Sequence, residues 1–309
     1  MILIDGAGLI YRAFYAIPQN FKNAKGDHTN AIYGFASMLL NILSVHNPDY
    51  IAVLFDRKEK TFRHEAYKEY KATRVAAPDI LYEQIPHVKD LLVAFHIKQF
   101  EKAGYEADDI IATIARHPQS SEVEVIIATG DFDMFQLIND NVKILYPEKG
   151  YREAVFFGTE ETYKKYGLAP EQIPDFKGLC GDSSDNIKGV YGIGKKGAID
   201  LLQKHKNLEG IYENLDEIKG AARKKLEAGR EDAFFCRKLA TLDSNVPIDF
   251  EIEECAHKDF DMTELLGVFR ELGFESLFTR LQKLNIKHVS GTSAPVMSSE
   301  DEKIQGSLF

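Results

Sequence analysis

The sequence predicts an α/β fold, in which a mostly parallel central sheet is flanked by helices and followed by a helical domain. Short β-rich runs at 2–5, 50–55, 96–99, 123–128 and 142–145 alternate with segments of helical periodicity, as in a parallel sheet with helical connections. After about residue 159 amphipathic segments dominate, at 159–166, 170–179, 196–206, 208–214, 221–241 and 261–284. We therefore expect a sheet domain over 1–168, a helical domain over 169–285 and a flexible tail over 286–309.

Two helices of the sheet domain have clear start signals. Asn30 can cap a segment whose apolar residues from Ile32 to Leu43 share one face, and which ends near Asn47 and Pro48. A second helix, over 106–116, has acidic residues in its first turn, where the helix dipole favours negative charge.

The composition is that of an ordinary globular protein. Of the 309 residues, 44% are hydrophobic and 28% charged. Cys180, Cys236 and Cys255 lack disulfide-framework or zinc-ligand spacing, which suits a reducing cytoplasm. We find no basic leader and no apolar run near the ~18 residues of a membrane span, so secretion and membrane insertion are not expected.

Acidic residues follow the apolar runs in short groups. Asp5 and Asp56 come after the first two strands, and the remaining groups are Glu106, Asp108 and Asp109; Asp131 and Asp133; and Asp182 and Asp185. The carboxyl ends of parallel strands converge, so these nine side chains are expected to face one crevice. Clustered carboxylates need positive charge, and all-oxygen ligation favours Mg²⁺ or Mn²⁺ over zinc.

Each acidic group also has a simpler explanation. Asp5 and Asp56 could be strand-end turn residues or helix caps, and Glu106, Asp108 and Asp109 favourable first-turn acids. Asp131 with Asp133, and Asp182 with Asp185, could be ordinary turns. A pair of divalent ions would explain the whole set, because two ions can together stabilise an in-line displacement at phosphorus. Phosphodiester hydrolysis is therefore the predicted chemistry.

Basic residues are concentrated in three segments, although the net charge is −10. Segment 57–74 mixes basic residues with aromatic ones, and the other two segments are 188–206 and 219–238. Such mixing suits a groove for single-stranded nucleic acid, so Arg63 and Tyr70 are expected to contact substrate. If 71–74 is helical, Lys71 and Arg74 share a face and could reach one phosphate. A mixed-charge surface helix is the alternative.

The glycine-rich run 189–196 superficially resembles a P-loop. Lys196 and Gly197 stand where a Ser or Thr should hold Mg²⁺, so we reject that interpretation. A helix-hairpin-helix over 186–206 fits better: Gly192 and Gly194 make the turn that binds a DNA phosphate, with Lys195 and Lys196 beside it. A plain interhelical turn is the alternative.

These strings together resemble the bacterial 5′-nuclease family, which comprises the N-terminal 5′→3′ exonuclease domain of DNA polymerase I and stand-alone homologues related to flap endonucleases. The matching strings are LIDG (3–6), FDRKEKTFRHEAYKEYKATR (55–74), GYEADD (104–109), TGDFD (129–133) and GDSSDNIKGVYGIG (181–194). The resemblance covers about residues 1–284. It implies a Mg²⁺-dependent, structure-specific nuclease, with two or more ions that Mn²⁺ can replace, acting on 5′ flaps, nicks or primer-template junctions in replication and repair.

The resemblance also implies residue roles. The nine acids named above would bind metal, Lys71 and Arg74 of an arch near 57–75 would contact the scissile phosphate, and Arg12 would lie near the 5′ end. Tyr70 would stack on a terminal base, and the hairpin 186–206 would grip duplex DNA, sometimes with K⁺. Phe132, Lys188 and Gly197 depart from the usual Lys or Arg, Pro and Thr, and none of these is an expected metal ligand.

The terminal QGSLF is similar to the bacterial sliding-clamp docking peptide, with Gln305, Leu308 and Phe309 as anchors. We expect a monomeric, cytoplasmic, nucleoid-associated nuclease. The rival hypotheses are a catalytically weak, clamp-tethered adaptor that binds flap DNA, and a PIN-type ribonuclease on a similar sheet.

Overall fold

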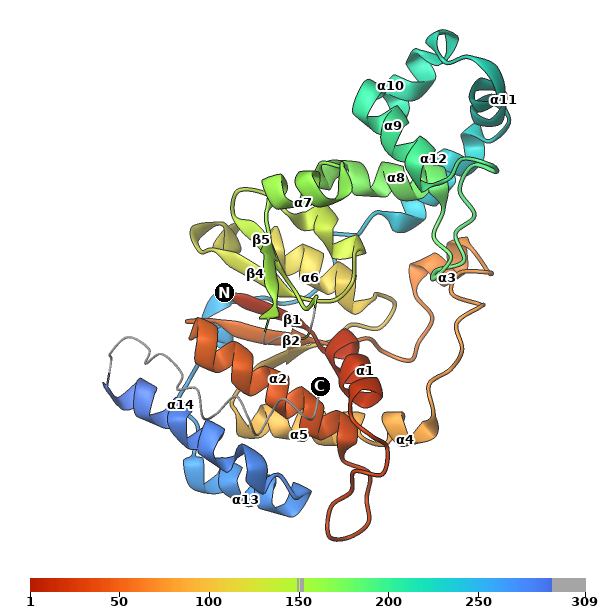
Figure 1. Cartoon of the computed structure of the whole chain (residues 1–309). Coiled ribbons are helices and arrows are strands. Elements are labelled where there is room, and N and C mark those ends of the chain that lie inside the picture. The colour runs from red at the N-terminus through yellow and green to blue at the C-terminus, as the bar shows by residue number, and fades with distance from the viewer. Residues whose placement is uncertain (149, 151–152, 291–309) are drawn as a thin grey trace.

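The computed structural model describes residues 1–148, 150 and 153–290 (Figure 1). The strands are β1 (Ile2–Asp5), β2 (Ile51–Leu54), β3 (Lys98–Phe100), β4 (Val125–Ala128), β5 (Val142–Tyr146) and β6 (Val155–Phe157). They form one sheet in the order β3-β2-β1-β4-β5-β6. All neighbouring pairs are parallel except β5 and β6, which confirms the mostly parallel sheet. The antiparallel edge strand β6 was not predicted.

Helices cover both faces of this sheet. The N-terminal half contributes α1 (Gly6–Ala16), α2 (Asn30–His46), α3 (Phe62–Ala66), α4 (Asp79–Tyr82), α5 (Ile85–Ala94) and α6 (Ala107–Ala115). Ile2 and Ile4 of β1 pack in a core with α1, α2 and α5, whereas Leu3 packs on the other face in a core with α6. This alternation follows from the two-residue side-chain period of a strand.

Helix α2 matches the predicted segment but not its predicted cap. Thr29 is the N-cap, and Asn30 lies inside the helix, fully buried. The Asn30 amide donates to the carbonyl oxygens of Phe14 and Ile17 at 3.0 and 3.2 Å, so its polar group ties α2 to the end of α1.

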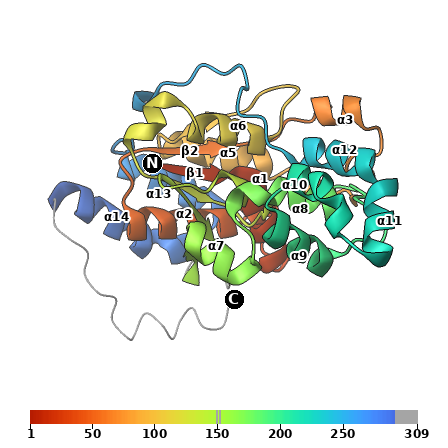
Figure 2. The same ribbon diagram turned by 90° about the horizontal axis from the view of Figure 1, so that it is seen from above.

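The second half of the chain is helical, as predicted. It contains α7 (Thr159–Tyr166), α8 (Ile173–Cys180), α9 (Lys195–His205), α10 (Leu208–Glu213), α11 (Gly220–Ala228), α12 (Arg230–Ala240), α13 (Met262–Leu272) and α14 (Phe278–Ser290). Short 3₁₀ helices are η1 (Pro118–Glu122), η2 (Asp133–Leu137), η4 (Pro170–Gln172), η5 (Leu215–Glu217), η6 (Ile252–Cys255) and η7 (Glu275–Leu277). Helices α8 to α12 form a lobe beside the sheet, visible in both views (Figures 1 and 2).

The last part of the segment predicted as the helical domain, 169–285, packs on the sheet part of the molecule. Residues after α12 leave the lobe and return to the sheet: Leu242, Val246 and Phe250 join the core around α6. Leu265 and Phe269 of α13, with Leu281 of α14, join the core around α2 and α5 (Figure 1). The lobe has its own small core over residues 168–233, and segment 242–284 belongs to the sheet part of the molecule.

Candidate metal centre at the carboxyl edge of the sheet

Asp5 lies at the end of β1, in the middle of the sheet, and is 6% exposed. It caps α1: its Oδ1 accepts the Gly8 amide at 2.8 Å, and its Oδ2 accepts the Thr129 hydroxyl at 3.0 Å. A Cβ on residue 8 would lie 2.2 Å from this carboxylate, so the helix start requires glycine there. Burial, together with repulsion from Asp56 and Asp131, raises the pKa of Asp5 to about 6.

The next acids come from the ends of β2 and β3. Asp56 Oδ1 accepts the Ala107 amide at 2.9 Å, which joins the end of β2 to the start of α6. Asp108 lies in the first turn of α6. Loss of hydration and then repulsion from Asp131, Asp5 and Asp56 raise the pKa of Asp108 well above its ordinary value, so these four carboxylates share one region.

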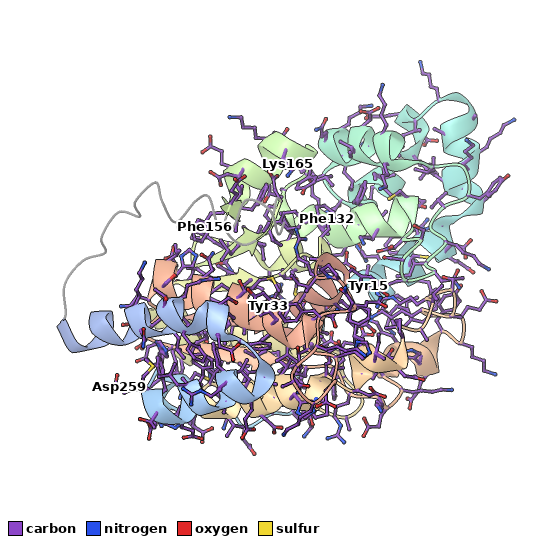
Figure 3. The ribbon with its side chains drawn as sticks, turned by 60° about the horizontal axis from the view of Figure 1, so that its bottom comes forward. Tyr15, Tyr33, Phe132, Phe156, Lys165 and Asp259 are labelled. Atoms are coloured by element: carbon purple, nitrogen blue, oxygen red, sulfur yellow. The ribbon has the colours of Figure 1, made fainter. Side chains whose placement is uncertain are left out.

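The loop after β4 presents two more acids. The Asp131 amide donates to the Thr129 hydroxyl at 3.0 Å, and Asp131 Oδ1 accepts the Asp133 amide at 2.8 Å. Between them Phe132 packs against Tyr166 and Phe176, with ring centroids 4.7 and 6.4 Å apart (Phe132 is labelled in Figure 3). The Phe132 ring therefore fixes the acidic loop to α7 and α8. A Lys or Arg at this position would not make these aromatic contacts.

Lys177 of α8 connects this loop to the 182–185 loop. Its ammonium contacts the carboxylates of both Asp133 and Asp182. Burial and repulsion from Asp131 raise the pKa of Asp133 to about 7 despite this cation. Burial opposes ionisation of Asp182 too, but Lys177 and two hydrogen bonds from Ser184 hold its pKa at about 2. The sequence analysis did not identify Lys177 as a partner of the acidic residues. Its position on α8, shortly before Asp182, was the available indication that it could pair with that carboxylate.

Tyr70 joins the remaining acids. Its hydroxyl lies 3.0 Å from Glu106 Oε2 and 2.9 Å from Asp185 Oδ2, so one phenolic proton serves two carboxylates. Lys71 Nζ donates to Glu106 Oε1 at 2.6 Å, and Arg74 Nη2 donates to Asp185 Oδ1 at 2.6 Å. Segment 67–74 therefore lies directly against the acidic cluster.

The helical arch expected near 57–75 is only partly present. Helix α3 ends at Ala66 and α4 begins at Asp79, and turns connect them. Lys71 has a left-handed backbone (φ 54°), which a helix does not allow. Its amide donates to the Asp185 carbonyl at 3.0 Å, and the Asn186 side chain donates to the Glu69 carbonyl at 2.7 Å. Contacts across the chain thus determine this conformation, and Lys71 and Arg74 reach the cluster without sharing a helix face.

Arg63 and Asp109, predicted to contact substrate and metal, form an internal ion pair in the structure. Arg63 is 1% exposed, and its guanidinium donates to both oxygens of Asp109 at 2.7 and 2.8 Å. It also donates to the carbonyls of Leu239 and Thr241 at 2.8 and 3.0 Å. Asp109 is 0% exposed. Arg63 is therefore unable to contact substrate, and Asp109 is unable to bind a solvent-derived ion, in this arrangement.

The stacking role expected for Tyr70 also disagrees with the structure. Its ring is only 3% exposed and packs edge-on against His64, with centroids 5.2 Å apart. Buried on its faces and bonded through its hydroxyl, Tyr70 positions Glu106 and Asp185 instead of presenting a ring to a base.

The other eight predicted acids form one connected cluster: Asp5, Asp56, Glu106, Asp108, Asp131, Asp133, Asp182 and Asp185. Within the described residues, no three His, Cys, Asp or Glu side chains are close enough to share one ion as they stand. Instead Lys71, Arg74 and Lys177 neutralise part of the charge. An all-carboxylate donor set in which Asp5, Asp56, Asp108 and Asp133 have raised pKa values fits hard divalent cations, because such ions relieve the same repulsion.

The segment predicted as a helix-hairpin-helix, 186–206, contains α9, and the helix before it, α8, ends at Cys180. Gly192 has φ 80°, and Gly194 caps α9, whose first residues Lys195 and Lys196 are exposed. Lys225 of α11 donates to the Gly192 carbonyl at 2.8 Å and so holds the turn. Exposed amide and ammonium groups at a helix start suit a phosphate.

The remaining predicted residues and cavities lie away from the cluster. Arg12 is exposed on α1 and donates to the Pro147 carbonyl at 2.8 Å.

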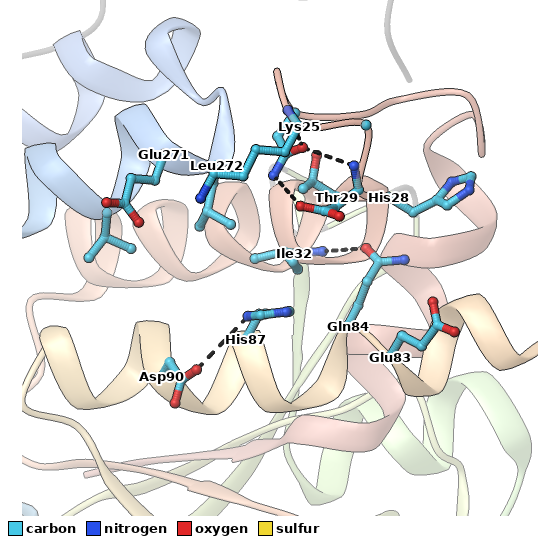
Figure 4. Close-up of a pocket in the computed structure, with 14 residues that line it drawn as sticks. Lys25, His28, Thr29, Ile32, Glu83, Gln84, His87, Asp90, Glu271 and Leu272 are labelled. Atoms are coloured by element: carbon cyan, nitrogen blue, oxygen red, sulfur yellow. Dashed lines mark hydrogen bonds and ion pairs between the residues drawn. The ribbon is translucent and has the colours of Figure 1, made fainter.

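A pocket of about 530 Å³ between the 23–29 loop, α5 and α13 contains none of the acids above (Figure 4). Within it, His87 Nδ1 lies 3.9 Å from Asp90 Oδ2. None of the helices in the described part of the chain has the length and apolarity to cross a bilayer. Gln305, Leu308 and Phe309 lie outside the described residues.

A mostly parallel sheet with carboxylates at its carboxyl edge, beside a helical lobe with a glycine turn before α9, is the arrangement expected of a nuclease. Two family models match, described as "5'-3' exonuclease, N-terminal resolvase-like domain" over residues 1–167 and "5'-3' exonuclease, C-terminal SAM fold" over 168–263. The chain belongs to the 5′-3′ exonuclease family, which confirms the resemblance seen in the sequence.

Relatives and solved structures agree with this assignment. DNA polymerase I of Bacillus subtilis is 39% identical over 97% of this chain, and that of Caldicellulosiruptor bescii is 40% identical over 91%. The chain spans only 36% and 33% of these relatives. T5 5′-exonuclease with bound zinc superposes with a TM-score of 0.64 at 22% identity, covering 93% of this chain and 98% of that one. The catalytic core of Rad2 with DNA gives 0.61 at 21%, covering 92% of each.

Proposed function

We propose that this protein is a Mg²⁺-dependent, structure-specific 5′-nuclease that hydrolyses DNA phosphodiesters at 5′ ends and flap junctions. The observation that carries the proposal is the cluster of eight carboxylates at the carboxyl edge of the sheet, contacted by Lys71, Arg74 and Lys177. Solved structures titled as metal-bound T5 5′-exonuclease and as Rad2 with DNA substrate share the fold, which supports this reaction class.

The acids would hold two or more divalent ions, with Mn²⁺ able to replace Mg²⁺. Such ions activate water and neutralise the charge that develops on a phosphoryl group. Asp5, Asp56, Asp108 and Asp131 would supply one part of the donor set, in which the other three carboxylates repel Asp108. Tyr70 orients Glu106 and Asp185 through its hydroxyl.

Lys71 and Arg74 act as electrophilic groups. In the structure each neutralises a carboxylate, Glu106 and Asp185 respectively. With divalent ions held by the carboxylates, Lys71 and Arg74 would be released from Glu106 and Asp185 and could bind a scissile phosphate at the cluster. Neither residue is a base in this mechanism, because both are held in the charged form by neighbouring carboxylates, which raise the pKa of each.

DNA is held outside the cluster as well. The turn at Gly192 and Gly194, with Lys195 and Lys196, would bind the duplex backbone, with K⁺ as a further ligand of that turn. Arg12 would contact the 5′ strand. We further propose work in replication and repair in the cytoplasm, at the nucleoid, including removal of RNA primers, and docking of a sliding clamp by Gln305, Leu308 and Phe309.

The test compares cleavage of a labelled 5′-flap DNA, a nicked duplex and single-stranded RNA in Mg²⁺ and in EDTA. The proposal predicts Mg²⁺-dependent cleavage near the flap junction with a 5′-phosphorylated product, and loss of cleavage in Asp131→Ala/Asp133→Ala with flap binding retained. Binding without cleavage in the wild type would indicate the adaptor, and preferred cleavage of RNA would indicate a ribonuclease.

A further inference from the structure

Three exposed tyrosines gather on α1 and α4, beside the acidic cluster. Tyr11 and Tyr15 are 37% and 66% exposed and lie one helical turn apart on α1, and Tyr82 at the end of α4 is 37% exposed. The Tyr11 and Tyr82 hydroxyl oxygens are 3.3 Å apart. Isolated exposed rings are common on protein surfaces, but three that converge from two helices form a surface that needs an explanation.

The rings are held in place without being covered. Tyr15 packs edge-on against the buried Phe14, with ring centroids 5.2 Å apart and planes at 89°, so one end of the group is fixed to the core (Tyr15 is labelled in Figure 3). The contact with Tyr82 fixes Tyr11 from the other side. Pre-positioned rings bind a planar ligand at a lower entropic cost than mobile ones.

Arginines border the same surface. Arg74 interacts electrostatically with Tyr11, and its side chain is 50% exposed while it bonds Asp185 of the acidic cluster. Arg12 follows Tyr11 on α1 and is exposed. The chain between α3 and α4 passes from the cluster to α4 on this side of the molecule (Figure 1). The surface is therefore aromatic, positively bordered and continuous with the candidate site.

We propose that Tyr11, Tyr15 and Tyr82 form a stacking platform for the unpaired 5′ segment of a nucleic acid, with Arg12 and Arg74 contacting its phosphates. This inference rests on the proposed function, and it adds the part of the substrate that lies beyond the cleaved bond. Aromatic faces stack on every base and arginines follow the backbone, so the platform is indifferent to sequence.

Helix geometry sets the length of strand that the platform serves. Along α1, at about 1.5 Å per residue, Tyr11 lies about 9 Å and Tyr15 about 15 Å beyond Asp5. At about 3.4 Å per stacked nucleotide, these positions correspond to roughly three to five nucleotides from the acidic cluster. Flaps shorter than this gain nothing from the platform, whereas longer flaps gain contacts.

The experiment measures kcat/KM in Mg²⁺ for flaps of about two and about ten nucleotides on one duplex, with DNA and RNA 5′ segments as separate arms. The platform predicts that the wild type prefers the long flap, and that Tyr11→Ala, Tyr15→Ala and Tyr82→Ala each lower the long-to-short ratio about 5-fold, the order expected for one lost stacking contact. Tyr15→Phe retains the ring and should retain the preference.

Tyr163→Ala on α7 is the matched control, because Tyr163 is 54% exposed on another face and is not part of the platform. Fluorescence anisotropy of a labelled single strand in Ca²⁺ measures binding independently of catalysis, and this binding should be weaker in the same three alanine variants.

A long-to-short ratio that the three alanine variants leave unchanged, while cleavage itself remains, overturns the platform. Absence of any wild-type cleavage would overturn the proposed function instead. If the alanine variants lower the long-to-short ratio only with an RNA 5′ segment, or only with a DNA one, that result identifies which kind of strand the platform binds.

Discussion

Replacing Arg63 with methionine should destabilise the fold, because it breaks an internal ion pair. The side chain is 1% exposed and makes two charge-assisted bonds to Asp109, at 2.7 and 2.8 Å, besides two to backbone carbonyls. Removing one partner of a buried pair typically costs about 3–5 kcal/mol. Asp109 keeps the amides of Glu106 and Asp243, at 3.2 and 2.9 Å, so we expect the lower end, about 3 kcal/mol.

Urea denaturation followed by circular dichroism measures this loss, which corresponds to a Tm lower by roughly 6–12 °C. Arg57→Met is the control: Arg57 pairs with Glu59, but their side chains are 41% and 48% exposed, so water screens the pair and the expected loss is much smaller than for Arg63→Met. The double variant Arg63→Met/Asp109→Leu should recover much of the stability, because the unpaired Asp109 charge is removed and Glu106, which Arg63 also contacts at 3.2 Å, keeps its ion pair with Lys71. If Arg63→Met keeps wild-type stability and loses DNA binding, our reasoning is refuted and Arg63 is a substrate contact.

Three further predictions concern the cluster and the hairpin. Asp5 and Asp133 have pKa values of about 6 and 7 against an ordinary 3.8, so their contribution to stability is complete below pH 4 and is lost as the pH rises. In scanning fluorimetry the Tm of the metal-free protein should therefore fall between about pH 4 and 7, and Mg²⁺ should make the Tm less dependent on pH. A Tm that rises over this range would contradict the prediction. Lys177→Met removes the ammonium that occupies the carboxylates of Asp133 and Asp182, so Mg²⁺ no longer competes with it for them. Calorimetry should find Mg²⁺ bound several-fold more tightly. Weaker binding would count against the cluster as the metal site. Gly192 has φ 80°, and a Cβ there would lie 2.8 Å from the Lys225 side chain, so Gly192→Ala should weaken duplex binding about 5-fold or more. Gly194→Ala, whose Cβ would enter open space, should have a much smaller effect. Equal effects of the two variants would exclude the proposed turn.

Features that depend on neighbouring residues were predictable from the sequence. The strand runs and the acids that follow them are local patterns, and the parallel sheet then brings Asp5, Asp56 and Asp131 together without further information. The turn at Gly192 was equally readable, because a positive φ favours glycine.

Features that depend on distant partners were not predictable. Arg63 looked like a surface cation because its carbonyl acceptors, Leu239 and Thr241, are about 175 residues away in the sequence. An amphipathic pattern over 261–284 shows that one face is buried, but it does not show that the face packs on α2 and α5 instead of the helical lobe. Lys71 is a good helix former, yet its contact with Asp185 sets a left-handed conformation that ends the expected helix.

The central claim is that the eight clustered carboxylates bind the divalent ions on which cleavage depends. A crystal soaked in Mn²⁺ and measured at the manganese edge tests it directly. The account predicts anomalous peaks among Asp5, Asp108, Asp131 and Asp185, with Lys71 displaced from Glu106. Peaks confined to other parts of the surface, with the Lys71–Glu106 contact intact in a crystal that still cleaves flap DNA, would contradict it.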